Sequence, residues 1–243
     1  MTTTSPRLAG RLALVTGATR GIGRAVALAY AREGTHVILV GRTPGALEET
    51  DDEIRSLGGS ATLLTLDLKQ HDKIDALGPT IYQRWNKLDI LVGNAGVLGP
   101  LSPLGHITAE AWNEVMEVNL TANWRLIRTL DPLLRRSDAG RAIFVTSGVA
   151  SSPRAYWGPY AISKAALEAL VRTYAHEMEN TPVRVNMINP GPTRTAMRSK
   201  AFPGEKPETL KRPEDLTETF VALAEPACRE NGRLFDLKSG KVR

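Results

Sequence analysis

The stretch from Leu12 to Glu33 reads LALVTGATRGIGRAVALAYARE. Its first five residues form a short apolar run, which is typical of a strand buried on both faces of a parallel sheet. Residues 24–33 carry apolar side chains along most of a helical segment. The glycines between the two permit positive φ angles and therefore a sharp turn. The stretch predicts a strand, a glycine-rich turn and a helix.

The glycine-rich turn has the spacing Gly-x-x-x-Gly-x-Gly, set by Gly17, Gly21 and Gly23. The free N–H groups and the positive dipole at the start of a helix favour a phosphate group there. The spacing differs from the Gly-x-Gly-x-x-Gly fingerprint, and the Lys and Ser/Thr of a nucleoside triphosphate loop are missing. From the glycines alone, a phosphate site and a plain turn without a ligand both stay open.

The rest of the chain repeats this alternation of strands and helices. We expect further strands at 36–40, 61–66, 88–92, 142–146, 183–188 and 234–236, and helices at about 44–57, 108–136, around 160–164 and at 213–223. The pattern predicts a single domain over residues 1–243, an α/β fold with a Rossmann-type doubly wound parallel sheet of about seven strands and helices on both faces. Residues 1–7 are expected to form a flexible leader, and the polar segment 195–212 a flap over a site.

Several residues lie at the carboxyl ends of the predicted strands. They are Gly17, Arg42, Asp67, Asn94, Ser147 and Pro190. Ligands of open α/β sheets bind at the carboxyl ends of the strands, so we expect one site along this edge. The Gly-Asn-Ala-Gly corner at 93–96 suits close backbone approach to a ligand and, equally, a plain turn.

Arg42 follows the second strand, where a dinucleotide fold reads the adenosine ribose. An acidic residue there binds a free 2′-hydroxyl group, whereas a basic one binds a 2′-phosphate. Arg20 in the glycine turn adds a second guanidinium group. A solvated loop cation is the alternative for Arg42. Asp67, after the third strand, suits either a bond from an adenine amino group or a cap on the next helix.

Residues 147–164 bring three reactive side chains into one region. Ser147 ends an apolar strand, and Tyr160 and Lys164 lie four residues apart on one face of a predicted helix. A neighbouring ammonium group favours the phenolate, so we expect Lys164 to lower the pKa of Tyr160 for acid–base chemistry near neutral pH. A chance Tyr–Lys spacing is the alternative that this motif alone leaves open. Asn119 lies in an apolar helical setting, so it is either a structural hydrogen-bond hub or a functional residue.

The composition narrows the function classes. The 243 residues carry 31 Lys and Arg against 26 Asp and Glu, a net charge of +5, but the basic residues are scattered. We therefore expect no nucleic acid partner. Cys228 is the one cysteine, which excludes an intrachain disulfide and a multi-thiolate metal site, and we expect no metal. The sequence shows no targeting segment and no apolar run of membrane-spanning length, so we expect a cytoplasmic protein without membrane contact.

These motifs, in this order, resemble the short-chain dehydrogenase/reductase family over nearly the whole chain. The resemblance rests on Thr16-Gly17-x-x-x-Gly21-Ile22-Gly23, Asp67, Asn94-Ala95-Gly96, Asn119, Ser147, Tyr160-x-x-x-Lys164 and Pro190-Gly191. It implies that Tyr160 is the general acid in carbonyl reduction and the base in reverse. It further implies that Ser147 donates to the reacting oxygen, that Lys164 binds the nicotinamide ribose, and that Asn119 holds a water linking Lys164 to solvent.

The resemblance also implies a nicotinamide cofactor. The expected cofactor-binding residues are Gly17, Thr19, Arg20, Gly21, Ile22, Gly23, Arg42, Asp67, Leu68, Asn94, Ala95, Gly96, Tyr160, Lys164, Pro190, Gly191, Thr193 and Thr195. Arg20 and Arg42 favour NADP(H), with NAD(H) as the alternative. The expected substrate is a small carbonyl compound or alcohol, and the expected assembly is a homodimer or homotetramer.

Substrate identity depends on residues 98–104, residues 149–157 and the flap. The stretch from Asn189 to Met197, followed by Ala-Phe-Pro, is similar to one in a bacterial subgroup of oxoacyl-carrier-protein-reductase-like oxidoreductases, but this names no substrate. Trp157 either walls the pocket or packs beneath it. The flap cations suggest an anionic substrate or, alternatively, a solvated surface. The ending Asp236–Gly240 departs from the family's glycine-rich acidic segment, so the oligomer contact made there stays open.

Two other classes of function are alternative interpretations of the same residues. A serine hydrolase is disfavoured because Ser147 lacks a Gly-x-Ser-x-Gly context and the four histidines show no triad pattern. A catalytically idle dinucleotide sensor or scaffold is the second alternative. Such a protein has no need for Ser147, Tyr160, Lys164 and Asn119 together, so the sequence favours an oxidoreductase.

Overall fold

A computed structural model of the protein describes residues 6–243. Its strands are β1 Leu12–Thr16, β2 His36–Gly41, β3 Ser60–Thr65, β4 Ile90–Gly93, β5 Arg141–Val145, β6 Arg184–Asn189, β7 Leu234–Asp236 and β8 Lys241–Val242. Its α-helices are α1 Gly21–Arg32, α2 Pro44–Ser56, α3 His71–Asp75, α4 Leu77–Trp85, α5 Ala109–Met116, α6 Ala122–Leu134, α7 Gly158–Glu177, α8 Ala196–Ala201 and α9 Thr217–Ala224. A π-helical turn, Glu117–Thr121, joins α5 to α6.

The eight strands of residues 6–243 lie in one sheet, in the order β3-β2-β1-β4-β5-β6-β7-β8. The pairs from β3 to β7 are parallel, and only β8 pairs antiparallel, with β7. The predicted doubly wound, Rossmann-type sheet is confirmed, although about seven strands were expected. The extra strand, β8, has two exposed residues and exists only through its pairing with β7, so it has no pattern of its own. The order reverses between β1 and β4, which places a ligand crevice at their carboxyl ends.

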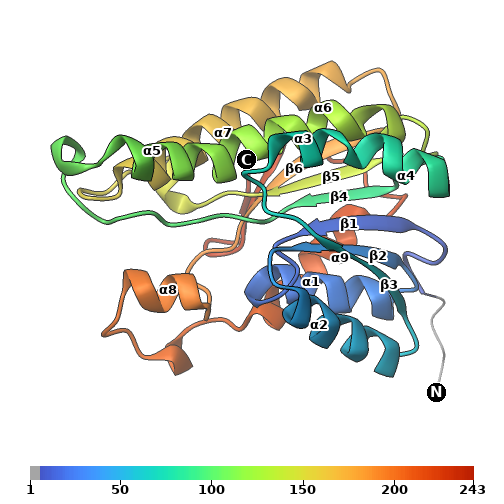
Figure 1. Ribbon diagram of the computed structural model, residues 1–243, viewed down its shortest axis with the longest axis horizontal. Coiled ribbons are helices and arrows are strands. Elements are labelled where there is room, and N and C mark those ends of the chain that lie inside the picture. Colours follow the sequence, from blue (N-terminus) through green and yellow to red (C-terminus); the bar gives the residue numbers. More distant parts are fainter. Residues whose placement is uncertain (1–5) are drawn as a thin grey trace.

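Helices cover both faces of the sheet (Figure 1), with α3 to α7 on one face and α1, α2 and α9 on the other. A buried apolar cluster fills each interface: Leu14 and Phe144 belong to the first, Val15 and Phe220 to the second. Because a central strand buries side chains on both faces, it reads as a continuous apolar run. The short helix α8 lies apart from both layers (Figure 1). None of the helices in residues 6–243 is both long and apolar enough to cross a membrane.

The predicted strand boundaries lie within two residues of the observed ones, but the helical segments differ more. Helices α3 and α4 were not predicted, since Gly78 and Pro79 interrupt any helical pattern between β3 and β4. The long helix expected from Thr108 is divided by the π-helical turn. Thr108 accepts a hydrogen bond from the Ala111 backbone N–H at 3.2 Å and so caps α5.

The expected leader is anchored at its last residue. The backbone N–H of Arg7 donates to Glu33 at 2.8 Å, and its guanidinium group pairs with Glu218 and Glu225. Residues 1–5 of the leader lie outside the described part of the chain.

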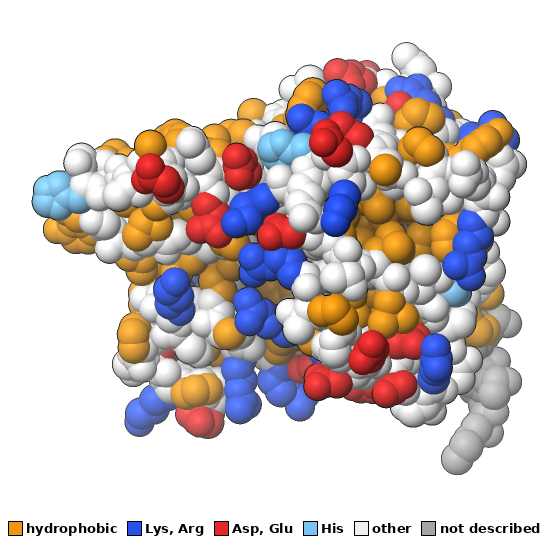
Figure 2. Space-filling model, in the orientation of Figure 1, with side chains coloured by type: hydrophobic (Ala, Val, Ile, Leu, Met, Phe, Trp, Pro, Cys, Tyr) orange, Lys and Arg blue, Asp and Glu red, His pale blue; other side chains and the backbone are white. Residues whose placement is uncertain are grey.

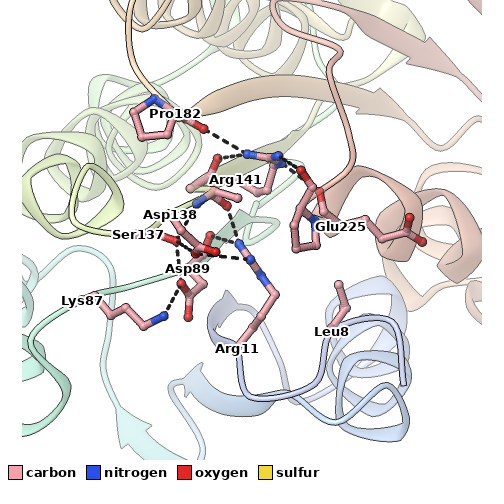
Figure 3. Close-up of polar contacts among 12 residues, drawn as sticks. Leu8, Arg11, Lys87, Asp89, Ser137, Asp138, Arg141, Pro182 and Glu225 are labelled. Atoms are coloured by element: carbon pink, nitrogen blue, oxygen red, sulfur yellow. Dashed lines mark hydrogen bonds and ion pairs between the residues drawn. The ribbon is translucent and has the colours of Figure 1, made fainter. Parts of the chain in front are cut away.

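Buried charged groups join distant segments at the amino ends of the strands (Figure 3). Arg141, the first residue of β5, donates to the carbonyl oxygens of Gly140, Pro182, Glu225, Pro226 and Cys228. Asp89 accepts from the Leu12 backbone and from the Ser137 hydroxyl group. This network lies at the opposite end of the sheet from the predicted site and holds the segment after α9, residues 225–228, onto it.

Candidate active site

The glycine turn after β1 forms a tightly packed cradle. Gly17 has φ +65°, in the left-handed region that favours glycine. A Cβ on Gly23 would lie well inside contact distance of the Gly17 carbonyl oxygen and of Asn94 Nδ2. Asn94 Nδ2 in turn donates to the Thr16 carbonyl at 2.8 Å. The turn thus sits against the end of β4, and α1 begins there without a side-chain cap on its N–H groups.

The Thr16 hydroxyl group has a role in the site that the sequence motif, which contains Thr16, did not assign to it. It donates to the Val92 carbonyl at 3.2 Å and accepts from the backbone N–H groups of Asn94 at 3.0 Å and Ala95 at 3.1 Å. These bonds fix the Asn94-Ala95 corner against β1. A hydroxyl residue directly before the first glycine of the turn is the signal that could have found it.

Arg20 and Arg42 are exposed at adjoining strand ends. Within residues 6–243 neither guanidinium group makes an ion pair or a side-chain hydrogen bond, whereas nearby Arg24 pairs with Glu53. Thr19 packs close to Gly41, which brings the glycine turn beside the end of β2. Figure 2 shows Lys and Arg side chains gathered around the recess between α8 and the rest of the molecule. Two free cations therefore stand where the adenosine ribose was predicted.

Not all predicted cofactor residues point toward this edge. The side chains of Ile22 and Leu68 pack in the apolar clusters on the two faces of the sheet. Asp67 makes a turn, because its carboxylate accepts from the Lys69 backbone N–H at 3.0 Å, while Gln70 precedes α3 as its N-cap. The helix-cap alternative for Asp67 is therefore wrong in detail, and its carboxylate remains at the strand end.

The segment after β6 returns to the glycine turn. Gly191 has φ +69°, and Thr193 is buried with its hydroxyl donating to the Gly191 carbonyl at 3.2 Å. Thr195 caps α8 by accepting from the Arg198 backbone N–H at 3.2 Å. Its methyl group lies 3.4 Å from where a Cβ on Gly21 would be. The flap thus starts beside the cradle, as the motif order predicted.

Ser147, Tyr160 and Lys164 come together between β5 and α7. Tyr160 is buried, and the Ser147 hydroxyl group lies close enough to the phenol to lower its pKa. Lys164 Nζ lies 5.9 Å from the centre of the Tyr160 ring and donates to the Val145 carbonyl at 2.8 Å. The side chain of Lys164 is only 3% exposed. A phenol, a hydroxyl group and an ammonium group therefore lie close together in one largely buried site.

The electrostatics of this pocket differ from the expectation in one respect. Burial raises the pKa of Tyr160, and the Ser147 hydrogen bond opposes that rise. The expected lowering of the Tyr160 pKa by Lys164 is not seen, because the ammonium group is turned to the Val145 carbonyl. Burial lowers the pKa of Lys164 itself to about 8. Ser147 is thus the neighbour that stabilises the phenolate here.

Asn119 is fully buried within the π-helical turn. Its amide oxygen accepts from the Val97 backbone at 2.8 Å, and its amide nitrogen donates to the Val97 carbonyl at 2.9 Å and the Ser163 hydroxyl at 3.0 Å. Asn119 Oδ1 and Lys164 Nζ also face one point, 3.3 Å and 3.6 Å from the place of a Cβ on Gly96. Asn119 is a structural hub that also reaches the side of the pocket holding Lys164.

Glu168 is a second residue that the sequence reasoning missed. It lies one turn after Lys164 on α7, is buried, and accepts from the Thr146 hydroxyl at 2.9 Å. Arg172 Nη2 lies 3.0 Å from the other carboxylate oxygen. Because Thr146 precedes Ser147, this contact fixes α7 against the strand end that carries the site. Its spacing of four residues from Lys164 is the available signal.

Family comparison agrees with this geometry. A model of the short chain dehydrogenase family matches residues 11–206. The chain belongs to the short chain dehydrogenase family. This short chain dehydrogenase is therefore an oxidoreductase, and the predicted family and enzyme class are confirmed.

Individual relatives of this short chain dehydrogenase cover nearly its full length. It is 40% identical over 235 residues to the uncharacterised oxidoreductase YciK of Escherichia coli K12, covering 95% of this chain and 93% of YciK. It is 30% identical over 247 residues to the 7alpha-hydroxysteroid dehydrogenase of the same organism, covering 98% of this chain and 96% of that enzyme.

Solved structures of other short chain dehydrogenases superpose closely. One from Shigella flexneri 2a, complexed with NADP, has a TM-score of 0.92 at 39% identity and covers 97% of this chain and 100% of its own. One from Escherichia coli CFT073, complexed with NADPH, has a TM-score of 0.92 at 40% identity and covers 96% of this chain and 98% of its own.

Proposed function

We propose that this chain is an NADP(H)-dependent oxidoreductase that interconverts a carbonyl compound and an alcohol, with Tyr160 as general acid and base. The observation that carries the proposal is the buried Tyr160 phenol, which lies beside the Ser147 hydroxyl group and the buried Lys164 at the same sheet edge as the glycine cradle. A sensor or scaffold that only binds a dinucleotide gains nothing from a buried phenol and a buried ammonium group in one pocket.

The residues of the sheet edge fit NADP(H). A Cβ on Gly17 would meet Asn94 Nδ2 at 2.9 Å, so the backbone itself forms the surface of the turn, and the N–H groups that open α1 suit a pyrophosphate. Arg20 and Arg42 suit the 2′-phosphate, because neither guanidinium group is engaged within residues 6–243. NADP and NADPH bound to the two solved relatives support the same choice.

The chain's own residues would handle the proton and the developing charge. NADP(H), when bound, supplies the hydride chemistry. Tyr160 holds the proton that passes to a carbonyl oxygen and takes it back in the reverse direction. Ser147 donates to the same oxygen and stabilises negative charge as it forms. The apolar surroundings of Tyr160 exclude water and strengthen both interactions.

Replacing the phenol tests the catalytic assignment. We expect Tyr160→Phe to bind NADPH as the wild type does and to lose turnover by at least about a hundredfold, the range for a lost general acid. NADPH fluorescence measures binding, and NADPH oxidation with a carbonyl panel measures turnover. Near-normal turnover by this variant would refute the role of Tyr160, and no turnover by the wild type would favour the sensor alternative.

Reversing the charge at the ribose position tests the cofactor choice. We expect Arg42→Glu to weaken NADPH binding by about a hundredfold, since a charge-assisted phosphate contact is lost and a repulsion is added, and to leave NADH binding unchanged or tighter. Arg32→Glu, on the exposed end of α1, is the matched control and should leave the NADPH/NADH ratio unchanged. Tighter binding of NADH than NADPH by the wild type would overturn the preference.

A further inference from the structure

An aromatic chain connects the reactive phenol to the flap. The Trp157 ring lies edge-on to Tyr160, with ring centres 6.0 Å apart, and contacts Phe202 at the end of α8 at 5.6 Å. Tyr156, which precedes Trp157, has φ +70°, and its carbonyl accepts from the Ser102 backbone N–H at 3.0 Å. This left-handed turn is unusual for a non-glycine residue and fixes the direction in which Trp157 leaves the chain. Trp157 therefore lies between the reactive phenol and the flap.

Apolar side chains from four segments complete this wall. Leu98, Val149, Tyr160 and Ala161 form a buried cluster, and Met197 and Ala201 of α8 pack against it. The flap therefore lies on the phenol through carbon surfaces. A substrate that brings its oxygen to Tyr160 must separate some of these contacts. The cost of that separation is offset only by a substrate that presents comparable apolar area to the same side chains.

The charged groups of the flap do not favour an anion at this wall. Arg198 is held by Glu205 through two bonds, of 2.5 Å and 2.6 Å, while its guanidinium group lies 3.8 Å from the Phe202 ring centre. Lys211 Nζ donates to the Leu237 carbonyl, and Arg212 pairs with Asp215. The other three basic residues of this region, Arg194, Lys200 and Lys206, are exposed to solvent. A carboxylate seated among Leu98, Val149 and Met197 would lose its hydration on carbon surfaces, and the cation beside this wall, Arg154, lies against the Phe202 ring, 5.8 Å from its centre.

We propose that the substrate is a carbonyl compound or alcohol with a flat, apolar, ring-containing body, which lies against Trp157 and Phe202 while its oxygen reaches Tyr160. This substrate class rests on the proposed function, and it excludes small keto acids as the preferred substrates. Phe202 and Trp157 are the specificity-determining residues, and the Arg198–Glu205 pair holds Phe202 in place.

Calorimetric titration tests the proposal without turnover. The wild-type protein saturated with NADP⁺ cannot reduce a ketone, so a dead-end complex reports binding alone. The probes are 2-tetralone, a flat bicyclic ketone, and acetoacetate, a small keto acid. We expect 2-tetralone to bind at least about tenfold more tightly, and Phe202→Ala to weaken it by about tenfold, the size of one lost aromatic contact. Phe202→Tyr should retain binding.

Lys200→Ala is the matched control, because Lys200 is an exposed cation two residues before Phe202. It should change neither affinity; a charge-based site would instead lose acetoacetate binding in this variant. NADPH affinity and melting temperature establish that each variant is folded, and Phe202→Leu replaces Phe202→Ala if the latter does not fold.

The outcomes separate the two proposals. Tighter binding of acetoacetate, binding of 2-tetralone that does not depend on Phe202, or no binding of either probe would each overturn the substrate class. If 2-tetralone binds in a Phe202-dependent manner and NADPH-loaded wild type reduces no ketone, the binding surface stands and the reductase function fails. If 2-tetralone is also reduced, and Phe202→Ala raises KM more than it lowers kcat, both proposals are supported.

Discussion

The buried position of Lys164 disfavours the protonated, charged form of its side chain. Burial lowers its pKa from 10.5 to about 8, although the Val145 carbonyl accepts from it. Below pH 8, Lys164 is protonated in both the folded and the unfolded state. Its buried charge therefore lowers the free energy of unfolding in this pH range. As the pH rises from about 8 toward 10.5, the folded protein has released this proton while the unfolded chain still binds it. The free energy of unfolding then rises with pH, because the folded protein no longer holds a buried charge at Lys164.

We expect this cost to appear as a pH-dependent difference between the wild type and Lys164→Met. The free energy of unfolding of the wild type, minus that of the variant, should increase by about 3 kcal/mol between pH 7.5 and pH 10.5. Urea unfolding of both proteins across this range measures it, and the titration of other groups cancels in the difference. A difference that stays constant with pH would contradict a lowered pKa at Lys164.

The residues of the site were largely predictable because they follow apolar strands. In a parallel sheet the carboxyl ends meet at one edge, so the order of the motifs placed Ser147 near the glycine turn without any contact being known. The partner of Lys164 was not predictable, because a backbone carbonyl leaves no mark in the sequence. The reversed pKa shift of Tyr160 has the same origin: it depends on burial and on the direction of one ammonium group.

At the scale of elements, the glycine turn depends on one close approach of two backbones. We expect Gly23→Ala to destabilise the fold by about 1–3 kcal/mol, the usual range for overpacking, because its methyl group would overlap the Gly17 carbonyl and the Asn94 amide. We also expect NADPH binding to be lost, since the cradle must widen. Thermal melting and NADPH fluorescence measure the two effects.

Gly45→Ala is the control for this substitution. Gly45 lies in α2, and nothing lies within 4 Å of the place of its Cβ. Alanine there should leave NADPH binding unchanged and stabilise the helix by up to about 1 kcal/mol. Equal effects of both substitutions would show that the close approach at Gly23 does not matter.

Helices and strands with a hydrophobic pattern in their own sequence were predicted. Elements that form only through contacts with neighbouring segments were not. β1 to β7 were predicted from their apolar residues, although β3 and β7 are less apolar than the others. β8 exists only by pairing with β7, and the π-helical turn at Glu117–Thr121 appears in the sequence as ordinary helix. That turn places Asn119 against Val97 and Ser163, so the element that escaped prediction is part of the site. The flap was expected, but its contact with Trp157 depends on tertiary packing.

At the scale of the whole molecule, Arg141 joins segments that are far apart in the chain. Its five carbonyl partners span residues 140–228. Arg141→Met would leave several of these buried acceptors unpaired, so we expect a loss of about 3 kcal/mol of unfolding free energy. Because the network lies at the opposite end of the sheet from Tyr160, kcat/KM at 20 °C should stay within about twofold of the wild type.

Arg135→Met serves as the control for the Arg141 prediction. Arg135 makes a partly exposed ion pair with Asp131 on α6, which contributes at most about 0.5 kcal/mol. Urea unfolding compares the two variants. A comparable loss of stability in both, or a large loss of kcat/KM in Arg141→Met, would contradict the separation of stability from activity along the sheet.

The two ends of the flap meet at a single point. Thr193 and Lys211 pair as neighbouring strands do, and the Arg194 backbone N–H donates to the Lys211 carbonyl at 2.9 Å. The segment between them leaves this point, packs on Tyr160 and Trp157 through α8 and Phe202, and returns to the same place. The closure entropy of a loop changes slowly with its length, so loops of other lengths could span the same two anchors at little cost. Insertions and deletions between Thr193 and Lys211 can therefore change the segment that faces the substrate. The sheet and the cofactor cradle do not have to change with it.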